Sequence, residues 1–265
     1  MEYVGFLMSI LIGITLGIFG SGGSILAVPV FVYLFGITPI TATLYSLFIV
    51  GFTTSIGSIS YFKNNLINFK IVMFFGIPSI IFVLISRKLV LPNIPDILFI
   101  FSSFTFYKNT AIMILFAVLM IFASYCMIKK GVENIIPNVD FNKPSYSLLI
   151  FQGSFVGFLT GLVGAGGGFL IIPALVIFMK LSVKEAIGTS LVIICLNSLI
   201  GFLSDFGNNL IEWIFLFKFL LLSILGIFIG FAISKKIESD NLKPYFGYFI
   251  LIMGIFIVIK ELFFK

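Results

Sequence analysis

The sequence predicts an all-α, polytopic integral membrane protein built from two homologous, inverted repeats. The first observation behind this prediction is composition: of 265 residues, 60% are hydrophobic and only 10% are charged, whereas a soluble domain carries roughly 25% charged residues. The second is an internal duplication, in which a glycine-rich motif occurs twice. Most of the chain could not face water without forming large apolar patches, so we expect the lipid bilayer to surround it.

Charge and reactive side chains exclude several classes of function. The net charge of +6 does not indicate a nucleic-acid partner, because the lysines lie at the ends of apolar runs, as in the loops of membrane proteins. The chain has no histidine, which excludes a histidine general base, proton relay or zinc ligand. It also has no nucleophile–base pair and no phosphate-binding loop of Walker spacing. We therefore expect neither an enzyme nor a bound cofactor or metal.

The duplication has a single register. A shift of 144 residues places 16–31 on 160–175, and the register continues without a gap until 64–67 falls on 208–211. Matched pairs include Gly17 with Gly161, Gly20 with Gly164, Gly22 with Gly166, Gly23 with Gly167, Pro29 with Pro173 and Ser46 with Ser190. We interpret 1–130 as the first membrane repeat, 131–147 as a polar linker and 148–265 as the second membrane repeat.

Each repeat contains the same series of apolar segments. In the first they are 4–19, 25–35, 41–62, 69–88 and 109–129, and in the second 148–163, 169–179, 185–206, 212–234 and 245–264. The last three segments of each set are long enough to cross roughly 30 Å of hydrocarbon. The first two are short and flank a glycine run. We interpret each short pair as half-helices meeting at a break inside the membrane, either as a re-entrant hairpin or as one broken span.

Basic residues indicate the orientation. If each short pair is a hairpin, most lysines gather on one face of the membrane. The other face then has fewer basic residues, namely Arg87, Lys88, Lys108, Lys260 and Lys265, with Lys218 nearby. The positive-inside rule therefore favours inverted repeats with both termini outside. Segment 90–108 has no counterpart in the second repeat, and we expect a short amphipathic or loop element at the outer surface.

The two glycine runs are the first candidate site. Glycine disfavours a helix by about 1 kcal/mol relative to alanine, and non-helical backbone within a bilayer needs partners from protein or a water-filled cavity. The short helices after the runs would present free N–H groups and a positive dipole end, which suits an anion. The candidate residues are Gly20, Ser21, Gly22, Gly23 and Ser24, and Gly164, Ala165, Gly166, Gly167 and Gly168. The alternative is that these glycines only allow close helix crossing.

Polar side chains of the third segment complete the candidate site. Ser46 and Thr53 are two helical turns apart, and Ser190 and Asn197 repeat that spacing, so each pair shares one helix face. These groups could donate hydrogen bonds to an anion, or the hydroxyls could bond to carbonyls of their own helix.

Charged residues do not fall centrally in any predicted span. Asp205, Glu212 and Lys218 lie near segment ends, where they can reach the interface. We therefore expect an anion to be held by helix dipoles and neutral donors, without a buried cation.

The motifs GIFGSGGSILAVP and GLVGAGGGFLIIP, with ATLYSLFIVG and AIGTSLVIICLNS after them, resemble the TauE/SafE family over nearly the whole chain. That resemblance implies a bacterial or archaeal inner-membrane permease for sulfite or organosulfonates such as sulfoacetate, usually an exporter. It implies an anion site at residues 20–24 and 164–168, flanked by Ser46, Ser190 and Asn197. Ser21 and Ser24 depart from an all-glycine pattern.

The expected function is transport of a small anion by alternating access. One alternative is a permease or channel for another small anion. A second is a thiol-redox conduit, in which Cys126 and Cys195 would have to approach within about 7 Å between their Cα atoms. A membrane scaffold is the third, and association into a homo-oligomer is open.

Overall fold

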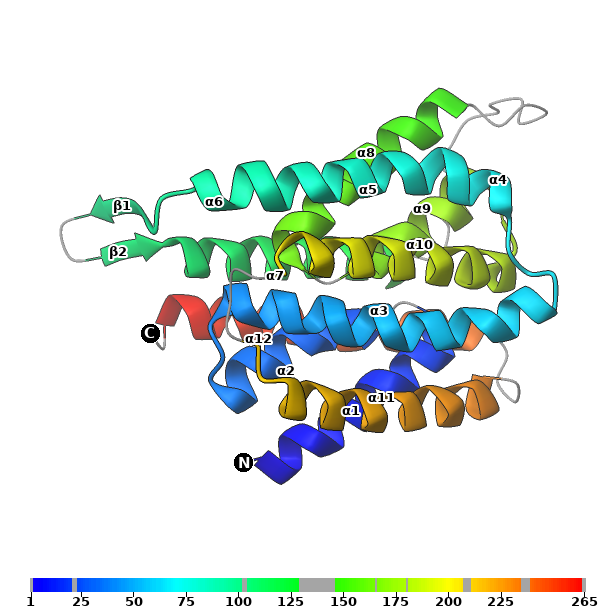
Figure 1. Ribbon diagram of the computed structural model, residues 1–265, viewed down its shortest axis with the longest axis horizontal. Helices are drawn as coiled ribbons and strands as arrows, with labels where there is room; N and C mark the ends of the chain where they lie inside the picture. The colour runs from blue at the N-terminus through cyan, green and yellow to red at the C-terminus, as the bar shows by residue number, and fades with distance from the viewer. Residues whose placement is uncertain are drawn as a thin grey trace.

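The structure is a computed structural model that describes residues 2–20, 23–101, 104–128, 146–164, 166–179, 181–206, 211–234 and 239–263. Within these residues it is a bundle of helices aligned along one direction, horizontal in Figure 1, with a single two-stranded hairpin at one end. Among the described residues, six helices are long and apolar enough to cross a membrane by length and composition, namely Pro39–Lys63, Phe69–Asn93, Lys108–Tyr125, Tyr146–Val163, Lys184–Ser204 and Trp213–Ser234. The predicted all-α membrane class is confirmed.

The first repeat follows the predicted order of segments. Its elements are α1 (Glu2–Phe19), α2 (Gly23–Phe35), α3 (Pro39–Lys63), α4 (Phe69–Ile71), η1 (Val72–Gly76), α5 (Ile77–Ile85), η2 (Ser86–Val90), α6 (Leu91–Asn93), β1 (Ile97–Phe101), β2 (Phe104–Tyr107) and α7 (Lys108–Ile128). The elements from α4 to α6 form one 25-residue helix, Phe69–Asn93, interrupted by the π-helical turns η1 and η2. π-Helical turns are rare in proteins, and those that occur often lie at functional sites.

The described residues of the second repeat form five helices: α8 (Tyr146–Val163), α9 (Gly168–Met179), α10 (Val183–Ser204), α11 (Trp213–Ser234) and α12 (Ser239–Phe263). Helix α10 begins with a capping box in which the Ser182 hydroxyl accepts from the Glu185 amide at 3.3 Å and the Glu185 carboxylate accepts from the Ser182 amide. Helix α8 has 18 residues and is longer than we predicted. The predicted linker, 131–147, lies almost entirely outside the described residues.

Segment 90–108 differs from our prediction of an amphipathic or loop element. Strand β1 pairs antiparallel with β2, with Ile97 opposite Tyr107 and Phe101 opposite Phe104. Aromatic and β-branched side chains favour strands, and both strands are rich in them. The run of apolar residues therefore forms a β-hairpin beyond the helices, and we call this end of the bundle the β-hairpin end (Figure 1).

Each short helix pair is a hairpin. In Figure 1, α1 runs away from the β-hairpin end, α2 returns toward it, and α3 starts there. The second repeat runs the other way, because α8 starts at the opposite end, α9 returns to that end, and α10 starts there. Helices α1 and α12 respectively begin and end at the β-hairpin end.

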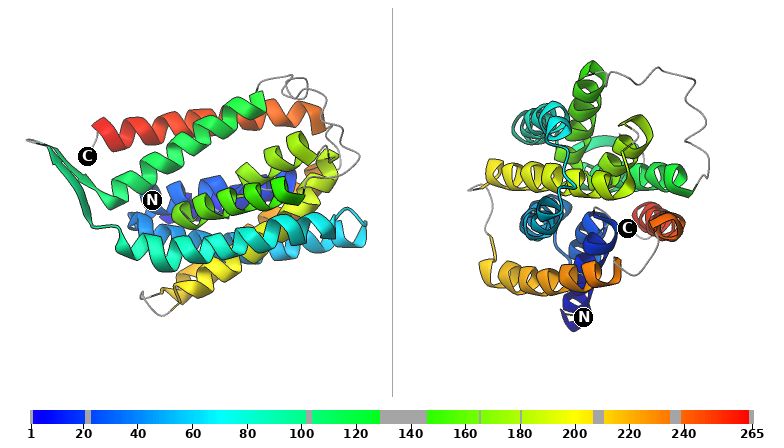
Figure 2. Two further views of the ribbon diagram at one scale, coloured as in Figure 1. Left: turned by 90° about the horizontal axis from the view of Figure 1, so that it is seen from above. Right: turned by 90° about the vertical axis from the view of Figure 1, so that its right-hand side faces the viewer.

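Helices of the two repeats pack on one another in matched pairs. Helix α1 packs on α11 as α8 packs on α5, α3 crosses α10, and α7 packs on α12, as the end view in Figure 2 shows. The contacts match residue by residue: Gly13 packs on the backbone of Ser223, and Gly157 packs on the backbone of Ser79. Both relations are shifts of 144 residues, so these contacts support the interpretation as inverted repeats.

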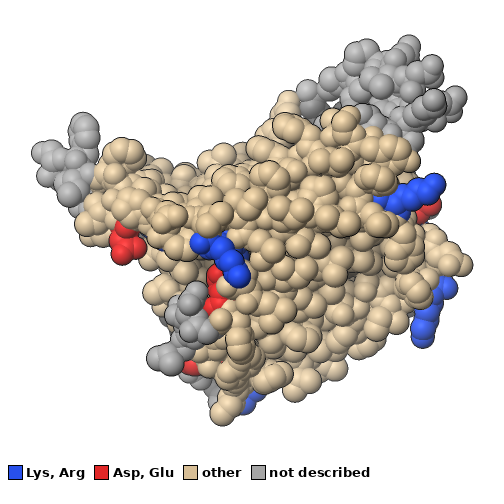
Figure 3. Space-filling view, turned by 45° about the horizontal axis from the view of Figure 1, so that its top comes forward, with Lys and Arg blue, Asp and Glu red and all other residues tan. Residues whose placement is uncertain are grey.

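The outer surface suits lipid. Large apolar side chains on the surface include Leu7, Phe151, Ile214 and Leu221, each at least 63% exposed. Figure 3 shows lysine, arginine and acidic side chains toward the two ends of the bundle, with a band free of charge between them on the face shown. A band of this kind would face the hydrocarbon of the bilayer.

Candidate functional site

The two glycine breaks, residues 20–24 and 164–168, reverse the chain between the helices of each hairpin. Gly20 and Gly164 have φ of 71° and 70°, and Gly166 and Gly167 have φ of 67° and 71°. Residues with a side chain rarely adopt these left-handed values, which explains why glycine occupies these positions. The predicted site residues Ser21, Gly22 and Ala165 lie outside the described residues.

The breaks are followed directly by helix N-termini inside the protein. Helix α2 begins at Gly23, and Gly23 and Ser24 are buried. Helix α9 begins at Gly168, which is buried as well. The first amides of both helices therefore point into the breaks and give each break a partial positive charge.

Each break packs against the helix that forms the third segment of the other repeat, α3 or α10. Gly20 faces Ile187 on α10, and Gly164 faces Thr43 on α3. A Cβ atom on Gly166 would lie 2.7 Å from the Ser198 hydroxyl of α10 and 3.1 Å from Val50 of α3. The second glycine break therefore lies where α3 and α10 cross.

Unpaired hydroxyl groups surround the second glycine break. Thr160 lies beside Gly167 and Ser198 beside Gly166, and Ser46 shares the face of α3 that carries Thr43 and Val50. The hydroxyl oxygens of Thr160, Ser198 and Ser46 are buried and have no hydrogen-bond partner among the described residues. Such groups are costly to bury, so their presence requires an explanation. Together with the N-terminus of α9 they could donate hydrogen bonds to an oxyanion.

The other predicted side chains form hydrogen bonds within their own helix or to a neighbouring helix. The Asn197 amide donates to the Ser79 hydroxyl at 2.7 Å, and the Thr53 hydroxyl donates to the Ser223 hydroxyl at 3.4 Å. These two pairs are again 144 residues apart, and neither bond is to a glycine break. The Ser190 hydroxyl donates to the Ile187 carbonyl of its own helix at 2.9 Å. Of the third-segment residues that we singled out, Ser46 is the one whose hydroxyl is free within the described residues.

Arg87 contradicts our expectation that no cation is buried. Its side chain is 1% exposed and pairs with Asp205, and its Nη2 donates to the Thr43 hydroxyl at 2.8 Å. We placed Arg87 at the end of a span, but the helix continues through η2 to Asn93, so Arg87 lies inside the bundle. Lys108, also expected at the surface, is 7% exposed and donates to the carbonyls of Leu91 and Ile94.

The residues of the ion pair differ in charge from their counterparts in the other repeat. In the register of 144 residues, Arg87 corresponds to Phe231 and Asp205 to Tyr61, so charged residues replace aromatic ones at matched positions. The structure shows that both pairs form contacts, since the rings of Tyr61 and Phe231 lie 5.8 Å apart. A comparison of the two repeats for changes of charge would have included Arg87 and Asp205 among several such positions.

The sequence matches the family described as Sulfite exporter TauE/SafE over residues 5–257. The chain belongs to this family. Its relatives include the "Probable membrane transporter protein YunE" of Bacillus subtilis, 26% identical over 97% of this chain and 99% of the relative. A "Probable membrane transporter protein" of Xylella fastidiosa is 25% identical over 94% of this chain and 91% of its own length. No solved structure matches the chain significantly.

A third relative, MJ0441 of Methanocaldococcus jannaschii, is 35% identical over 41% of this chain. Membership of the TauE/SafE family confirms the resemblance seen in the glycine motifs. Together with the named relatives it supports a multi-pass membrane transporter.

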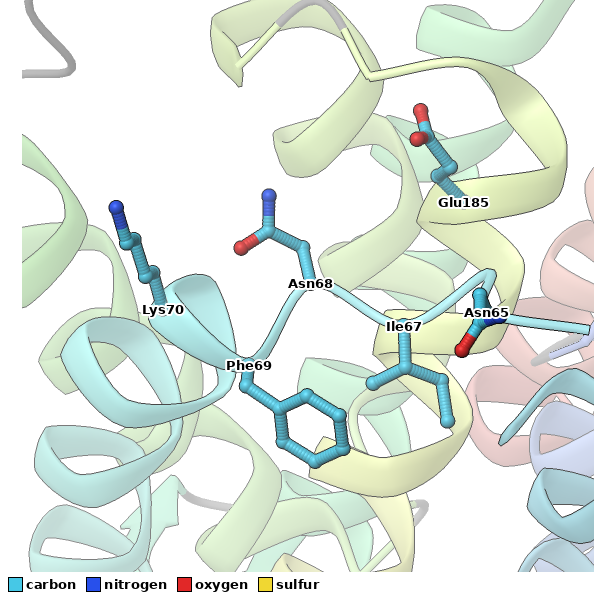
Figure 4. A pocket seen from close by; sticks show the side chains of 6 residues that line it. All are labelled: Asn65, Ile67, Asn68, Phe69, Lys70 and Glu185. Carbon is cyan, nitrogen blue, oxygen red and sulfur yellow. The ribbon is translucent and has the colours of Figure 1, made fainter. Parts of the chain in front are cut away.

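A shallow pocket of this TauE/SafE protein lies away from the two glycine breaks. It has a volume of about 370 Å³ and is lined by Asn65, Ile67, Asn68, Phe69, Lys70 and Glu185. Asn68 lies at the turn from α3 into α4, and Figure 4 shows Lys70 on one side of it and Glu185 of α10 on the other. None of the predicted site residues that the structure describes lines this pocket, and its acidic and basic side chains do not favour an anion. We therefore place the candidate site at the second glycine break.

The alternative of a thiol-redox conduit stays untested. Cys195 is a free thiol on α10. The side chain of Cys126 on α7 lies outside the described residues.

The two matched hydrogen bonds predict unequal contributions to stability. We expect Asn197→Leu to lower the free energy of unfolding by about 1 kcal/mol, because the short bond to Ser79 is lost inside the membrane. Thr53→Val should lower it by less, because its bond to Ser223 is 3.4 Å long. Unfolding of the purified variants in detergent measures both values, and a larger effect for Thr53→Val would contradict the prediction.

Proposed function

We propose that this TauE/SafE protein is a permease that carries a small sulfur oxyanion, sulfite or an organosulfonate, out of the cell by alternating access. The substrate binds at the second glycine break, in the inner membrane, and both termini of the chain lie outside. The observation that carries this proposal is the group of unpaired hydroxyls of Ser46, Thr160 and Ser198 near the N-terminus of α9.

The chemistry of these groups suits the substrate class. Sulfite and sulfonate groups each expose three oxygen atoms that accept hydrogen bonds. Neutral hydroxyls and main-chain amides at a helix N-terminus donate to such oxygens without supplying a full charge. Binding of this kind is reversible, which a carrier needs in order to release its substrate.

The arrangement of the repeats suits alternating access. Each glycine break belongs to one repeat and contacts α3 or α10 of the other, so a rocking of one repeat against the other changes both contacts. The matched pairs of contacts mean that the two repeats could exchange conformations. The site would then open to one end of the bundle at a time.

The test is flux in proteoliposomes. Labelled sulfite, sulfoacetate and sulfate are loaded, and their release is followed with and without a pH gradient. We expect saturable release of a sulfur oxyanion, and counterflow into preloaded vesicles would distinguish a carrier from a channel. Absence of flux for all three anions would contradict the proposed function.

Substitution of the hydroxyls tests the site. Ser198→Ala and Thr160→Val should each raise the KM for the transported anion about tenfold, since a hydrogen bond to a charged group contributes about 1.5–3 kcal/mol. The control is Ser154→Ala, because the Ser154 hydroxyl donates to the Ile150 carbonyl of its own helix at 2.8 Å. Equal KM values in all three variants would contradict a site at the second glycine break.

A further inference from the structure

The guanidinium of Arg87 lies next to the second glycine break. Its Nη2 donates to Thr43, which is the residue that packs against Gly164. Its Nη1 pairs with Asp205, and its Nε has no hydrogen-bond partner among the described residues. Arg87 therefore connects the break to Asp205, which follows the last residue of α10 at the β-hairpin end.

The matched place in the other repeat shows that the fold does not require a charge here. Phe231 and Tyr61 occupy the positions that correspond to Arg87 and Asp205, and their rings are in contact. The correspondence extends to their surroundings, because Gly57 packs near Phe231 and Gly201 packs near Arg87. At one end of the bundle the helices are thus joined by the apolar contact of Tyr61 with Phe231, and at the other end by the ion pair of Arg87 with Asp205.

The ion pair is a costly way to join two helices. Desolvation of a buried pair can outweigh its electrostatic attraction, and an apolar replacement is often as stable. Ionisable groups inside a membrane protein therefore mark substrate or ion pathways more often than structural contacts.

We propose that Arg87 forms a second binding position for the substrate oxyanion, between the second glycine break and the β-hairpin end. This inference rests on the proposed function. Asp205 is the resident counter-ion: it pairs with the guanidinium when the position is empty, and the oxyanion displaces it. No covalent bond changes in this exchange.

The surroundings of the pair suit such an exchange. The Asp205 side chain is 14% exposed and the Arg87 side chain is fully buried, so the carboxylate can move toward water while the guanidinium stays in place. A guanidinium binds two oxygens of one planar or tetrahedral oxyanion through parallel N–H bonds, which a lysine cannot do. Departure of Asp205 frees Nη1, and the unpaired Nε is a further donor on the same guanidinium.

The single tryptophan of the chain reports on this position. Trp213 lies 6.0 Å from Phe206 and 6.4 Å from Phe202 between ring centres. Phe206 directly follows Asp205, and Phe202 precedes it by three residues. Movement of Asp205 is therefore expected to change the fluorescence of Trp213. This measurement needs no transport and no label.

The experiment is a titration of the full-length protein in detergent with sodium methanesulfonate and sodium sulfite, with sodium chloride as the reference salt. We expect a saturable change of Trp213 fluorescence in the native protein and loss of that change in Arg87→Gln. Asp205→Asn should reach half-saturation at about one tenth of the native anion concentration, because the competing carboxylate is removed. The control Lys88→Gln removes the neighbouring, exposed charge and should titrate like the native protein.

The exchanged pair Arg87→Asp/Asp205→Arg separates substrate binding from a structural role. It restores opposite charges but places a carboxylate next to the break, so we expect a folded protein with no anion-dependent fluorescence and at least a hundredfold loss of flux. Native titration and flux in the exchanged protein would overturn the inference and leave the proposed function standing. Arg87-dependent titration without flux in the native protein would support the binding position and overturn the proposed function.

Discussion

Replacement of Gly166 by valine is expected to abolish transport while the protein remains inserted in the membrane. Gly166 has a φ of 67°, which a β-branched residue rarely adopts. A Cβ atom there would lie 2.7 Å from the Ser198 hydroxyl and 3.1 Å from both Ile194 and Val50. The valine side chain would therefore crowd the unpaired hydroxyls of the proposed site.

Gly36 provides the matched control for this variant. Its φ of 68° is almost the same, but a Cβ atom there meets nothing within 4 Å. Gly36→Val therefore carries the backbone strain without the crowding, and it should keep substantial flux. We expect flux of Gly166→Val at least a hundredfold below that of Gly36→Val at equal amounts of folded protein in the vesicles. Normal transport by Gly166→Val would contradict the assignment of the second glycine break as the site.

Local patterns predicted most of the fold of this TauE/SafE protein. Apolar runs predicted most long helices to within a few residues, because length and hydropathy decide whether a segment can cross a bilayer. Helix α12 begins at Ser239, six residues before the predicted start at 245. The run 69–88 was a second exception, since Arg87 and Lys88 look like the interfacial end of a span. The helix continues to Asn93 because Arg87 finds a partner inside the bundle.

The candidate site was predicted less completely than the fold. The glycine runs drew attention to the breaks, since repeated helix-breaking residues are unusual in apolar segments. The partners of the side chains were not visible, because Arg87 and Asp205 are 118 residues apart and meet only after the repeats pack. For the same reason we selected Asn197 for the site and not Ser198, although the first bonds to Ser79 and the second faces Gly166.

The second large effect is expected at the helix crossing of α8 and α5. A Cβ atom on Gly157 would lie 2.6 Å from the Cα atom of Ser79, so the backbones of the two helices are in direct contact. Gly157→Val should lower the free energy of unfolding by about 3 kcal/mol, because backbone atoms cannot move aside as a flexible side chain can. Gly76→Ala is the control, since its Cβ atom would be 3.7 Å from the nearest neighbour.

Gly13 extends this prediction to a test of the repeats. It corresponds to Gly157 in the register of 144 residues, and its Cβ atom would lie 2.8 Å from the Cα atom of Gly226 on α11. If the two repeats pack by the same contacts, Gly13→Val should destabilise the protein by a similar amount. Detergent-induced unfolding of Gly13→Val, Gly157→Val and Gly76→Ala measures the three values. Loss of stability in only one of the two valine variants would mean that the crossings of α1 with α11 and of α8 with α5 are not equivalent, and native stability in both would contradict the close packing itself.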